Sequence, residues 1–250
     1  MSFKDKVAIV TGSGSGMGAA TALLFAEEGA HIVIVDFNEE RAKNTAKSCK
    51  KLGNKVLVII ADVSKKEDDE KIINDTVEAF GRIDILVNNA GTVKVGKILD
   101  GTLIDTFDEV VNTNLRAVVV LTSLAAPHLA KTKGCVINTS SIFSTAFRYG
   151  SIFPSYCVSK AGVDAFTRVA ALELASSGVR VNAVNPGPVY TNLLIHNGLP
   201  GTWEEYSQFT ALKKGSDPKE VGNLILYLAS DKAKSITGVC YEIDNGMNLV

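Results

Sequence analysis

Short apolar runs rich in β-branched residues alternate with longer helical patterns from one end of the chain to the other. Several runs are apolar at every position, which is typical of parallel strands that helices cover on both faces. The alternation therefore predicts an α/β fold, a Rossmann-type doubly wound parallel sheet of about seven strands with helices on both faces. The expected strands are 7–10, 32–35, 56–60, 83–87, 135–138, 179–184 and 239–243, and the expected helices lie near 17–28, 39–52, 66–80, 103–130, 155–176 and 218–229.

Length and composition favour one domain over residues 1–250. Hydrophobic residues make up 46% of the 250 residues, which is enough for a substantial core. No internal repeat or linker divides the chain. The alternation of strand and helix patterns is interrupted only around residues 188–216, a segment rich in Gly, Pro, Thr and aromatic residues. We expect this segment to form a lid.

Net charge, apolar runs and cysteine spacing indicate which binding partners and which cellular compartment to expect. A formal net charge of −1 gives no pull toward nucleic acid or an anionic membrane surface. The N-terminus lacks a signal core, and no apolar run approaches membrane-spanning length. The four cysteines have no Cys-x-x-Cys spacing, so neither disulfides nor a metal is expected. These features predict a cytoplasmic protein without a nucleic-acid or membrane partner.

A glycine-rich segment, Thr11-Gly12-Ser13-Gly14-Ser15-Gly16-Met17-Gly18, connects the first expected strand to the first expected helix. Glycines there allow a tight turn and let a pyrophosphate approach the positive end of the helix. Glycines also occur in plain turns, but this position between strand and helix predicts a dinucleotide site. The candidate cofactor contacts in it are Gly12, Ser15, Gly16, Met17 and Gly18.

The second expected strand ends in Asp36. A carboxylate at this position accepts hydrogen bonds from the adenine ribose hydroxyls and repels a 2′-phosphate. Phe37 and Asn38 follow it, and neither they nor the glycine loop supply a cation. The pattern favours NAD over NADP. The alternatives are that Asp36 is an ordinary turn residue, or that the cofactor is NADP(H).

Tyr156 and Lys160 are four residues apart, so on a helix their side chains lie on one face. A phenol titrates near ~10, and an ammonium about 4 Å away contributes roughly 4 kcal/mol, or about 3 pKa units, at an intermediate dielectric. This spacing predicts a tyrosine that exchanges protons near neutral pH.

Together these motifs resemble the classical branch of the short-chain dehydrogenase/reductase family over essentially the full chain. The resemblance implies a nicotinamide dinucleotide cofactor, and here NAD. The motifs that carry it are Thr11-Gly12 with Gly16 and Gly18, Asp62-Val63, Asn88-Asn89-Ala90-Gly91, Asn114, Ser141, Tyr156 with Lys160, and Asn185-Pro186-Gly187. The further cofactor contacts implied are Asp36, Phe37, Asp62, Val63, Asn89, Ala90, Gly91, Tyr156, Lys160, Pro186, Gly187, Val189 and Thr191.

The resemblance also implies a catalytic tetrad. Tyr156 would be the general acid and base, and Lys160 would lower its pKa and bind the nicotinamide ribose. Ser141 would orient the substrate oxygen, and Asn114 would hold a water that relays protons from Lys160. Ser140 is adjacent to Ser141, and either could face the site.

The segment between Ser141 and Tyr156 is about two residues longer than usual in the family. Its aromatic residues Phe143, Phe147 and Phe153 are candidates for an apolar substrate site, although they could equally pack under the loop or at a subunit contact. We interpret His196, in the expected lid, as a surface histidine.

The resulting hypothesis is an NAD(H)-dependent oxidoreductase that interconverts a secondary alcohol and a ketone. Aromatic residues favour a medium-sized apolar substrate of steroid, hydroxyacyl or isoprenoid type. The alternatives are an NADP(H)-dependent carbonyl or 3-oxoacyl reductase and a non-catalytic dinucleotide-binding regulator. Enoyl reductases of similar fold separate their Tyr and Lys by more residues. The resemblance further implies a homotetramer or homodimer joined through helices 103–130 and 155–176 and the last strand.

Overall fold

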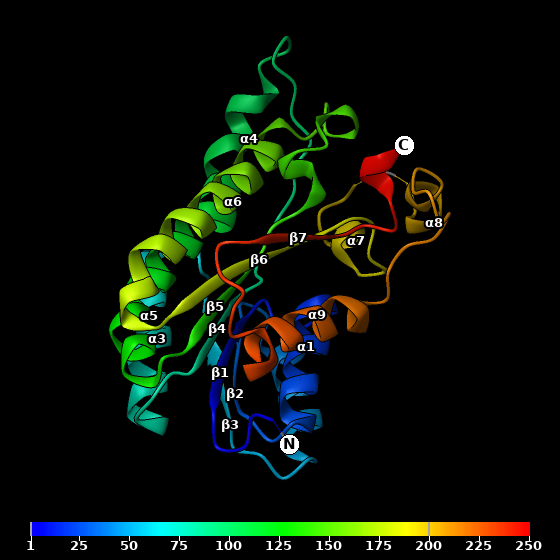
Figure 1. The fold of residues 1–250 in the computed structure, drawn as a ribbon. Coiled ribbons are helices and arrows are strands. Elements are labelled where there is room, and N and C mark those ends of the chain that lie inside the picture. Colours follow the sequence, from blue (N-terminus) through cyan, green and yellow to red (C-terminus); the bar gives the residue numbers. More distant parts are fainter. Residues whose placement is uncertain (1, 200) are drawn as a thin grey trace.

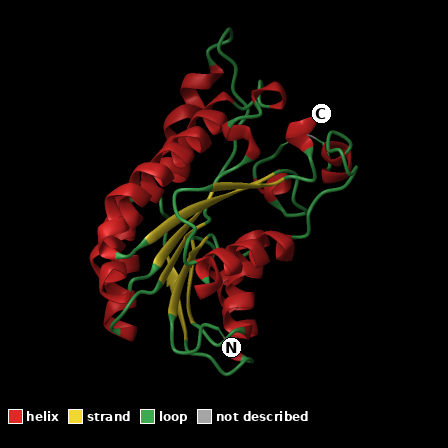
Figure 2. Cartoon of the chain, in the orientation of Figure 1, coloured by secondary structure: helices red, strands yellow, loops and turns green. Residues whose placement is uncertain are grey.

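The described part of the chain, residues 2–199 and 201–250 of a computed structural model, is built on one parallel β-sheet (Figures 1 and 2). The strand order β3-β2-β1-β4-β5-β6-β7 reverses direction beside β1, as in a doubly wound fold. The predicted fold class is confirmed. The strands are β1 (Val7–Thr11), β2 (His31–Asp36), β3 (Val56–Ile60), β4 (Ile85–Asn88), β5 (Cys135–Thr139), β6 (Arg180–Pro186) and β7 (Cys240–Ile243).

Helices cover both faces of the sheet, and each face has its own apolar core (Figure 1). The apolar strands supply both cores because alternate side chains point to opposite faces. One face is covered by α1 (Gly16–Glu27), α2 (Glu39–Lys50) and α9 (Pro218–Ala229). The other is covered by α3 (Lys66–Phe80), α5 (Ala117–Thr132) and α6 (Pro154–Leu174), and α4 (Thr102–Val111) extends beyond the sheet alongside α6.

The helix expected over residues 103–130 is interrupted. A π-helical turn, Asn112–Arg116, joins α4 to α5. Such turns widen the helix locally and recur at functional sites. Asn114 lies in the middle of this turn and is fully buried. The irregular turn thus places a polar side chain toward the carboxyl ends of the strands.

The expected lid contains two short helices, α7 (Leu193–His196) and α8 (Trp203–Ser207). Its two ends meet at an isolated bridge between Val189 and Ser216. There the Tyr190 N–H donates to Ser216 O at 3.0 Å, and the Ser216 N–H donates to Pro188 O at 2.9 Å. The lid therefore leaves the fold and returns to it at one point.

Within the described residues, one helical stretch, Thr102–Thr132, is long and apolar enough by length and composition to cross a membrane. Its α5 part contributes Leu121, Ala125 and Leu129 to the core beside the sheet. A core helix beside a sheet can meet the same criterion of length and composition.

Candidate active site

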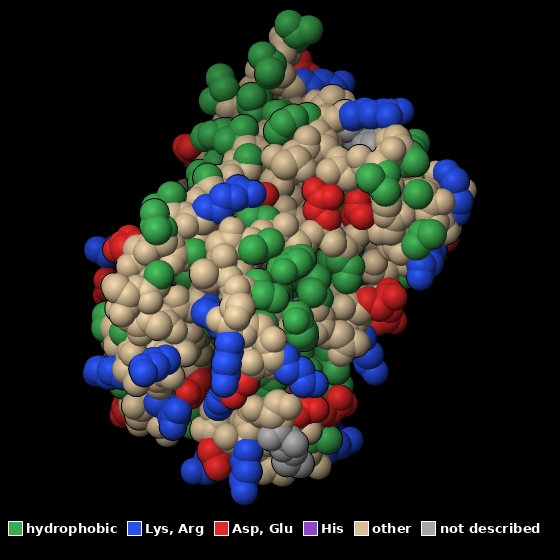
Figure 3. Space-filling view, viewed as in Figure 1, with side chains coloured by type: hydrophobic (Ala, Val, Ile, Leu, Met, Phe, Trp, Pro, Cys, Tyr) green, Lys and Arg blue, Asp and Glu red, His purple; other side chains and the backbone are tan. Residues whose placement is uncertain are grey.

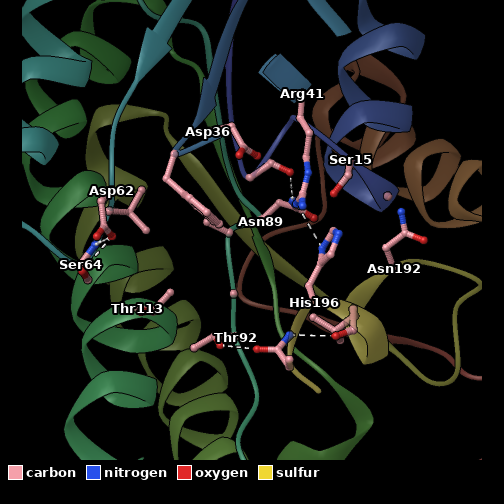
Figure 4. A pocket seen from close by; sticks show the side chains of 18 of the residues that line it. Ser15, Asp36, Arg41, Asp62, Ser64, Asn89, Thr92, Thr113, Asn192 and His196 are labelled. Atoms are coloured by element: carbon pink, nitrogen blue, oxygen red, sulfur yellow. Dashed lines mark hydrogen bonds between the residues drawn. The ribbon is translucent and has the colours of Figure 1, made fainter. Parts of the chain in front are cut away.

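A cleft of about 450 Å³ opens at the carboxyl ends of the first strands (Figure 4). The end of β1, the beginning of α1 and the end of β2 form one wall. The loops after β3 and β4 form the second wall, and α7 of the lid lies over the cleft. The predicted cofactor residues that line it are Gly12, Ser15, Gly16, Met17, Asp36, Phe37, Asp62, Val63, Asn89, Ala90, Gly91 and Thr191.

The glycine loop is shaped as a dinucleotide requires. Gly12 has φ +62° and Gly16 has φ +54°, a region that favours glycine. A Cβ on Gly14 would lie 2.7 Å from Asp36 Oδ2, and one on Gly18 would overlap Gly12 O. Gly18 does not line the cleft, so its part is to let α1 pack closely against the loop.

The beginning of α1 is free to bind an anion. Ser15, its N-cap, makes no side-chain capping hydrogen bond, and no acidic residue lies in the first turn. The first N–H groups of a helix have no partner within the helix and carry partial positive charge. This helix start fits a pyrophosphate.

Thr11 and Asn89 fasten the glycine loop to the end of β4. Thr11 Oγ1 accepts hydrogen bonds from the N–H groups of Asn89 and Ala90, both at 3.0 Å. Asn89 Nδ2 donates to Thr11 O at 2.9 Å and to Gly12 O at 3.3 Å. The shape of the loop is therefore held by hydrogen bonds within the protein.

Asp36 is buried at the end of β2, and its two oxygens are oriented by backbone donors. Oδ2 accepts from the Gly14 N–H at 2.8 Å, and Oδ1 accepts from the Asn38 N–H at 2.9 Å. Each oxygen retains accepting capacity, because a carboxylate has about four lone-pair sites. The position fits hydrogen bonds from ribose hydroxyls.

A second, more apolar pocket of about 130 Å³ adjoins the cleft. The two share Met17, Asn89, Gly91, Thr191 and Leu193. The predicted residues found in this pocket are Ser141, Phe143, Phe153, Tyr156, Lys160, Pro186, Gly187 and Val189. Every predicted cofactor contact except Gly18 thus lies in one pocket or the other.

The Ser141 hydroxyl lies near enough to the Tyr156 hydroxyl to act on its pKa by hydrogen bonding. Ser141 Oγ also accepts from the Phe143 N–H at 3.2 Å, which holds the serine at the start of a 3₁₀ turn, Ile142–Ser144. Ser140 instead donates to Lys160 O at 3.1 Å. Of the two adjacent serines, Ser141 is therefore the one whose hydroxyl faces the tyrosine.

Lys160 is buried one turn after Tyr156 on α6. Its Nζ donates to Thr139 O at 2.7 Å and lies 5.5 Å from the centroid of the Tyr156 ring. Burial lowers the pKa of Lys160 to about 8, and Asp164 opposes this shift. Burial raises the pKa of Tyr156 to about 12, while the hydrogen bond with Ser141 acts in the lowering direction.

The raised pKa of Tyr156 differs from the lowering expected from the Tyr–Lys spacing. The expectation counted the ammonium and omitted the cost of burying a phenolate. It also placed the ammonium about 4 Å from the phenol, whereas Nζ is directed to Thr139 O.

Asn114 lies close to Lys160 but is bound to the backbone of the β4 loop. Its Oδ1 accepts from the Thr92 N–H at 2.8 Å, and its Nδ2 donates to Thr92 O at 2.8 Å. A Cβ on Gly91 would lie 3.4 Å from Asn114 Oδ1 and 3.7 Å from Lys160 Nζ. The two side chains therefore converge on Gly91.

The three phenylalanines proposed for the substrate site separate into two groups. Phe143 and Phe153 line the apolar pocket, with ring centroids 6.2 Å apart, and Phe143 meets the Tyr156 ring edge-on. Phe147 is not among the residues that line the pocket, and 61% of its surface is exposed, so the structure does not bring it together with the other two. It belongs to a 3₁₀ turn, Phe147–Tyr149, on which alternating patterns do not predict direction.

Residues of the lid also line the two pockets. Trp203 lines the apolar pocket, and its Nε1–H donates to Thr191 O at 2.6 Å. His196 and Asn197 line the cofactor cleft, as do Arg41 and Thr92 on its walls. His196 is exposed, as expected of a surface histidine, and it also lines the cleft. The sequence carries no comparable signal for Arg41, Thr92 and Asn197. Among the described residues, no group of three or more His, Cys, Asp or Glu side chains could hold a metal ion.

Known proteins share this architecture. The family model described as enoyl-(acyl carrier protein) reductase matches residues 12–248. The chain is 37% identical to the meso-2,3-butanediol dehydrogenase of Serratia marcescens over 98% of this chain and 96% of the relative.

Two solved structures superimpose over nearly the whole chain. A short-chain dehydrogenase/reductase of Caenorhabditis elegans, solved with cofactor, has a TM-score of 0.93 and 33% identity, covering 100% of this chain and 97% of that one. The L-sorbose reductase of Gluconobacter frateurii, complexed with NADPH and L-sorbose, has a TM-score of 0.89 and 32% identity, covering 99% and 98%. This chain belongs to the short-chain dehydrogenase/reductase family, whose members bind a nicotinamide dinucleotide and act on alcohols and ketones.

Proposed function

We propose that this protein is an NAD(H)-dependent dehydrogenase that interconverts an uncharged secondary alcohol and its ketone. The observation that carries the proposal is the convergence of Tyr156, Ser141 and Lys160 in an apolar pocket that shares a wall with the cofactor cleft. A substrate oxygen bound at Tyr156 is thereby placed beside the cofactor cleft, which is the arrangement that hydride transfer needs.

The chemistry divides between cofactor and protein. The bound nicotinamide supplies the hydride acceptor for oxidation and the donor for reduction. Tyr156 takes the proton from the alcohol during oxidation and returns it to the carbonyl oxygen during reduction. Ser141 holds that oxygen in line, and the Lys160 ammonium stabilises the phenolate form of Tyr156.

Asn114 has a supporting part in this proposal. Its side chain fixes the Gly91–Thr92 segment beside Lys160. A water held there would connect Lys160 to solvent and replace the proton that Tyr156 gives up.

The preference for NAD rests on Asp36. Its oriented carboxylate favours ribose hydroxyls and repels a 2′-phosphate. NADP(H) is the second candidate, because Arg41 lines the same cleft and the Gluconobacter relative was solved with NADPH. In the structure the Arg41 guanidinium is engaged with His196 at 3.3 Å. We therefore favour NAD.

Calorimetric titration with NADH and NADPH tests this choice. We expect NADH to bind at least ten-fold more tightly, and Asp36→Ala to reduce or reverse the preference, because the repulsion of the 2′-phosphate is removed. Glu39→Ala, which removes an exposed carboxylate from the start of α2, is the matched control and should not change the ratio. Equal affinity of the unaltered protein for both cofactors would contradict the preference.

The composition and volume of the pocket support a proposal about the substrate class. Of the residues that line it, Lys160 is the only charged one, and the rest are mainly apolar or aromatic. Its volume of about 130 Å³ is close to the roughly 150 Å³ of a cavity that holds benzene in another protein. We propose that the substrate buries an apolar group of about the size of one ring and carries no charge near its hydroxyl.

A panel of secondary alcohols with NAD, followed by nicotinamide absorbance, tests both reaction and substrate. We expect turnover of 2,3-butanediol, cyclohexanol or 1-phenylethanol, and at least ten-fold lower kcat/KM for hydroxy acids and 3-hydroxyacyl-CoA thioesters. Tyr156→Phe should reduce kcat by about 10²-fold or more, because the general base is lost. Tyr227→Phe, at a half-exposed tyrosine on α9, is the matched control.

Two results would contradict the proposal. Tight cofactor binding without turnover of any alcohol or ketone would favour a dinucleotide-binding regulator. Efficient reduction of an enoyl thioester would favour the reaction in the description of the matching family model. The four-residue spacing of Tyr156 and Lys160 argues against the second result.

We also propose that the protein self-associates through α4 and α6. Hydrophobic side chains gather at the end of the molecule that carries α4 (Figure 3). Ile104 on α4 and Val169 and Leu172 on α6 have 80%, 63% and 82% of their surface exposed. Sedimentation velocity on the wild type and on Val169→Asp tests this, with a shift from a dimer or tetramer toward monomer as the expected result.

A further inference from the structure

Two consecutive lid residues contact opposite walls of the cofactor cleft. His196 is the last residue of α7, and Asn197 follows it. His196 Nδ1 lies 3.3 Å from Arg41 Nη1 on the α2 wall, and Asn197 Oδ1 lies 2.7 Å from Thr92 Oγ1 on the β4 wall. Figure 4 shows Arg41 and His196 directed toward each other across the cleft. Residues 196–197 therefore span the cleft opening.

The contact on the α2 wall has a defined direction. A guanidinium can only donate, so His196 Nδ1 accepts the hydrogen bond and the imidazole is neutral with its proton on Nε2. Arg41 is set in place because its own N–H donates to Asn38 Oδ1 at 3.0 Å, which is the N-cap interaction of α2. A protonated His196 would lose this bond and face a second cation.

The contact on the β4 wall connects the lid to Asn114. Thr92 donates its hydroxyl to Asn197 Oδ1, and the Thr92 N–H and C=O pair with the Asn114 side chain. Asn197 Nδ2 in turn donates to Leu193 O at 2.9 Å, so the asparagine is held by α7 itself. A chain of hydrogen bonds thus runs from α7 through Thr92 to the residue beside Lys160.

Just before α7, the lid also contacts the glycine loop. A Cβ on Gly16 would lie only 3.1 Å from Thr191 Cγ2. Lid residues therefore meet the beginning of α1, the beginning of α2 and the β4 loop. The same lid residues line the cleft in which a dinucleotide would lie.

We propose that His196 and Asn197 form a clasp that holds the lid closed over the bound dinucleotide and sets the rate at which the cofactor leaves. Both are positioning residues, acting through Arg41 and Thr92. Breaking the hydrogen bond between Asn197 and Thr92 also frees Thr92, which weakens the placement of Asn114. The inference rests on dinucleotide binding by this family and depends neither on the choice between NAD and NADP nor on the substrate.

The test is the dissociation rate of the reduced cofactor, measured by stopped-flow nicotinamide fluorescence after displacement with excess oxidised cofactor. NADH or NADPH is used, whichever binds more tightly. His196→Ala and Asn197→Ala should each speed dissociation about three- to ten-fold, the effect expected of one net hydrogen bond. Ile195→Ala, on the exposed side of the same helix, is the matched control and should leave the rate unchanged.

A double-mutant cycle separates the clasp from direct cofactor contacts of Arg41. If Arg41 acts through His196, adding His196→Ala to Arg41→Ala should change the rate by less than two-fold. Thr92→Val should speed cofactor dissociation as much as Asn197→Ala does. It should not change the additional effect of His196→Ala, because His196 contacts the α2 wall and Asn197 contacts the β4 wall.

The pH dependence gives a second readout. The charged groups that face His196 are Arg41 and Asp36, and burial and Arg41 lower its pKa below 6.5 while Asp36 opposes them. Dissociation from the unaltered protein should therefore accelerate as the pH falls below about 6.5. His196→Gln keeps an accepting oxygen without a titrating group and should bind the cofactor normally with a rate independent of pH in this range. Unchanged dissociation in both His196→Ala and Asn197→Ala, or full additivity in the Arg41 cycle, would overturn the clasp.

Discussion

Asn185, near the end of β6, donates a hydrogen bond from Nδ2 to Asp164 Oδ2 on α6 across 2.9 Å. The same nitrogen lies 3.0 Å from Ser144 Oγ and 3.2 Å from Ser141 O. One buried amide therefore joins the helix that carries Tyr156 to the turn that carries Ser141. The relative position of the two hydroxyls depends on it.

Replacing Asn185 should affect both stability and turnover. We expect Asn185→Ala to lower the free energy of unfolding by about 1–3 kcal/mol, because buried acceptors lose their donor. We also expect kcat to fall by about ten-fold, because a displacement of the Ser141 turn of about 1 Å is costly for catalysis. Urea unfolding and steady-state kinetics measure the two effects.

Asn182 offers the matched comparison, since it is a buried asparagine on the same strand that donates to Ile236 O at 2.9 Å, away from the site. Asn182→Ala should be destabilising without a specific loss of kcat. Equal losses of kcat in the two variants would show that Asn185 has only a structural part.

The two adjacent serines should differ in their effects. Ser141→Ala should lower kcat/KM by about 10²-fold, as expected on losing an oriented donor to the reacting oxygen. It should also raise the apparent pKa of the oxidation profile, because the Ser141 hydrogen bond lowers the pKa of Tyr156. Ser140→Ala removes a bond to Lys160 O and should leave that apparent pKa in place. A larger loss of activity at Ser140 would reverse the assignment.

The direction of reaction should respond to pH through Tyr156. Oxidation needs the phenolate and reduction needs the phenol, so kcat/KM should rise with pH for the alcohol and fall with pH for the ketone. Burial raises the pKa of Tyr156 to about 12, and Lys160 should bring the apparent value of the loaded enzyme below this. Lys160→Met should therefore move the oxidation profile to higher pH. An unmoved profile would show that the ammonium does not act on the phenol.

A buried carboxyl on α3 should make stability depend on pH. Asp69 is fully buried 3.3 Å from Arg116 Nη1, and burial raises its pKa from 3.8 to about 7. The folded protein thus holds this proton more tightly than the unfolded chain. The resulting stability is present below about pH 4 and is lost as the pH rises to about 7, by at most about 4 kcal/mol.

Unfolding measured between pH 4 and 7 tests this dependence. Asp69→Asn should show a shallower decline than the unaltered protein, because its side chain does not titrate. Asp75→Asn, at the carboxylate on the same helix that pairs with Lys71, serves as the comparison and should retain the slope. Parallel curves for the Asp69 variant and the unaltered protein would place the pH dependence elsewhere.

The parts of the fold that the sequence predicts correctly are those governed by local patterns. Strands such as β1 and β2 are apolar on both faces, and the glycine spacing follows from a backbone that must turn between strand and helix. Asp36 and Tyr156 can be singled out from the sequence because their positions relative to such patterns suggest chemistry. These relations hold within short stretches of chain.

The features that the sequence did not predict depend on contacts between distant segments. The π-helical turn at Asn114 has the same apolar spacing as a continuous helix. The contact of Arg41 with His196 joins residues 155 positions apart, so neither residue reveals the other. The burial that raises the pKa of Tyr156 also involves a separate segment of chain, because Phe143 meets the Tyr156 ring edge-on.

The pairing of Val189 with Ser216 has an evolutionary consequence. Because the lid departs from and rejoins the sheet at one bridge, the part of it after Asn197 can change in sequence and length without altering the strands. That part carries Trp203 of the apolar pocket, so changing it would change which alcohols fit. Thr191, His196 and Asn197 have to be kept, because they line the cofactor cleft. Exchanging the later part of the lid between relatives is therefore a direct route to redesigning the substrate range.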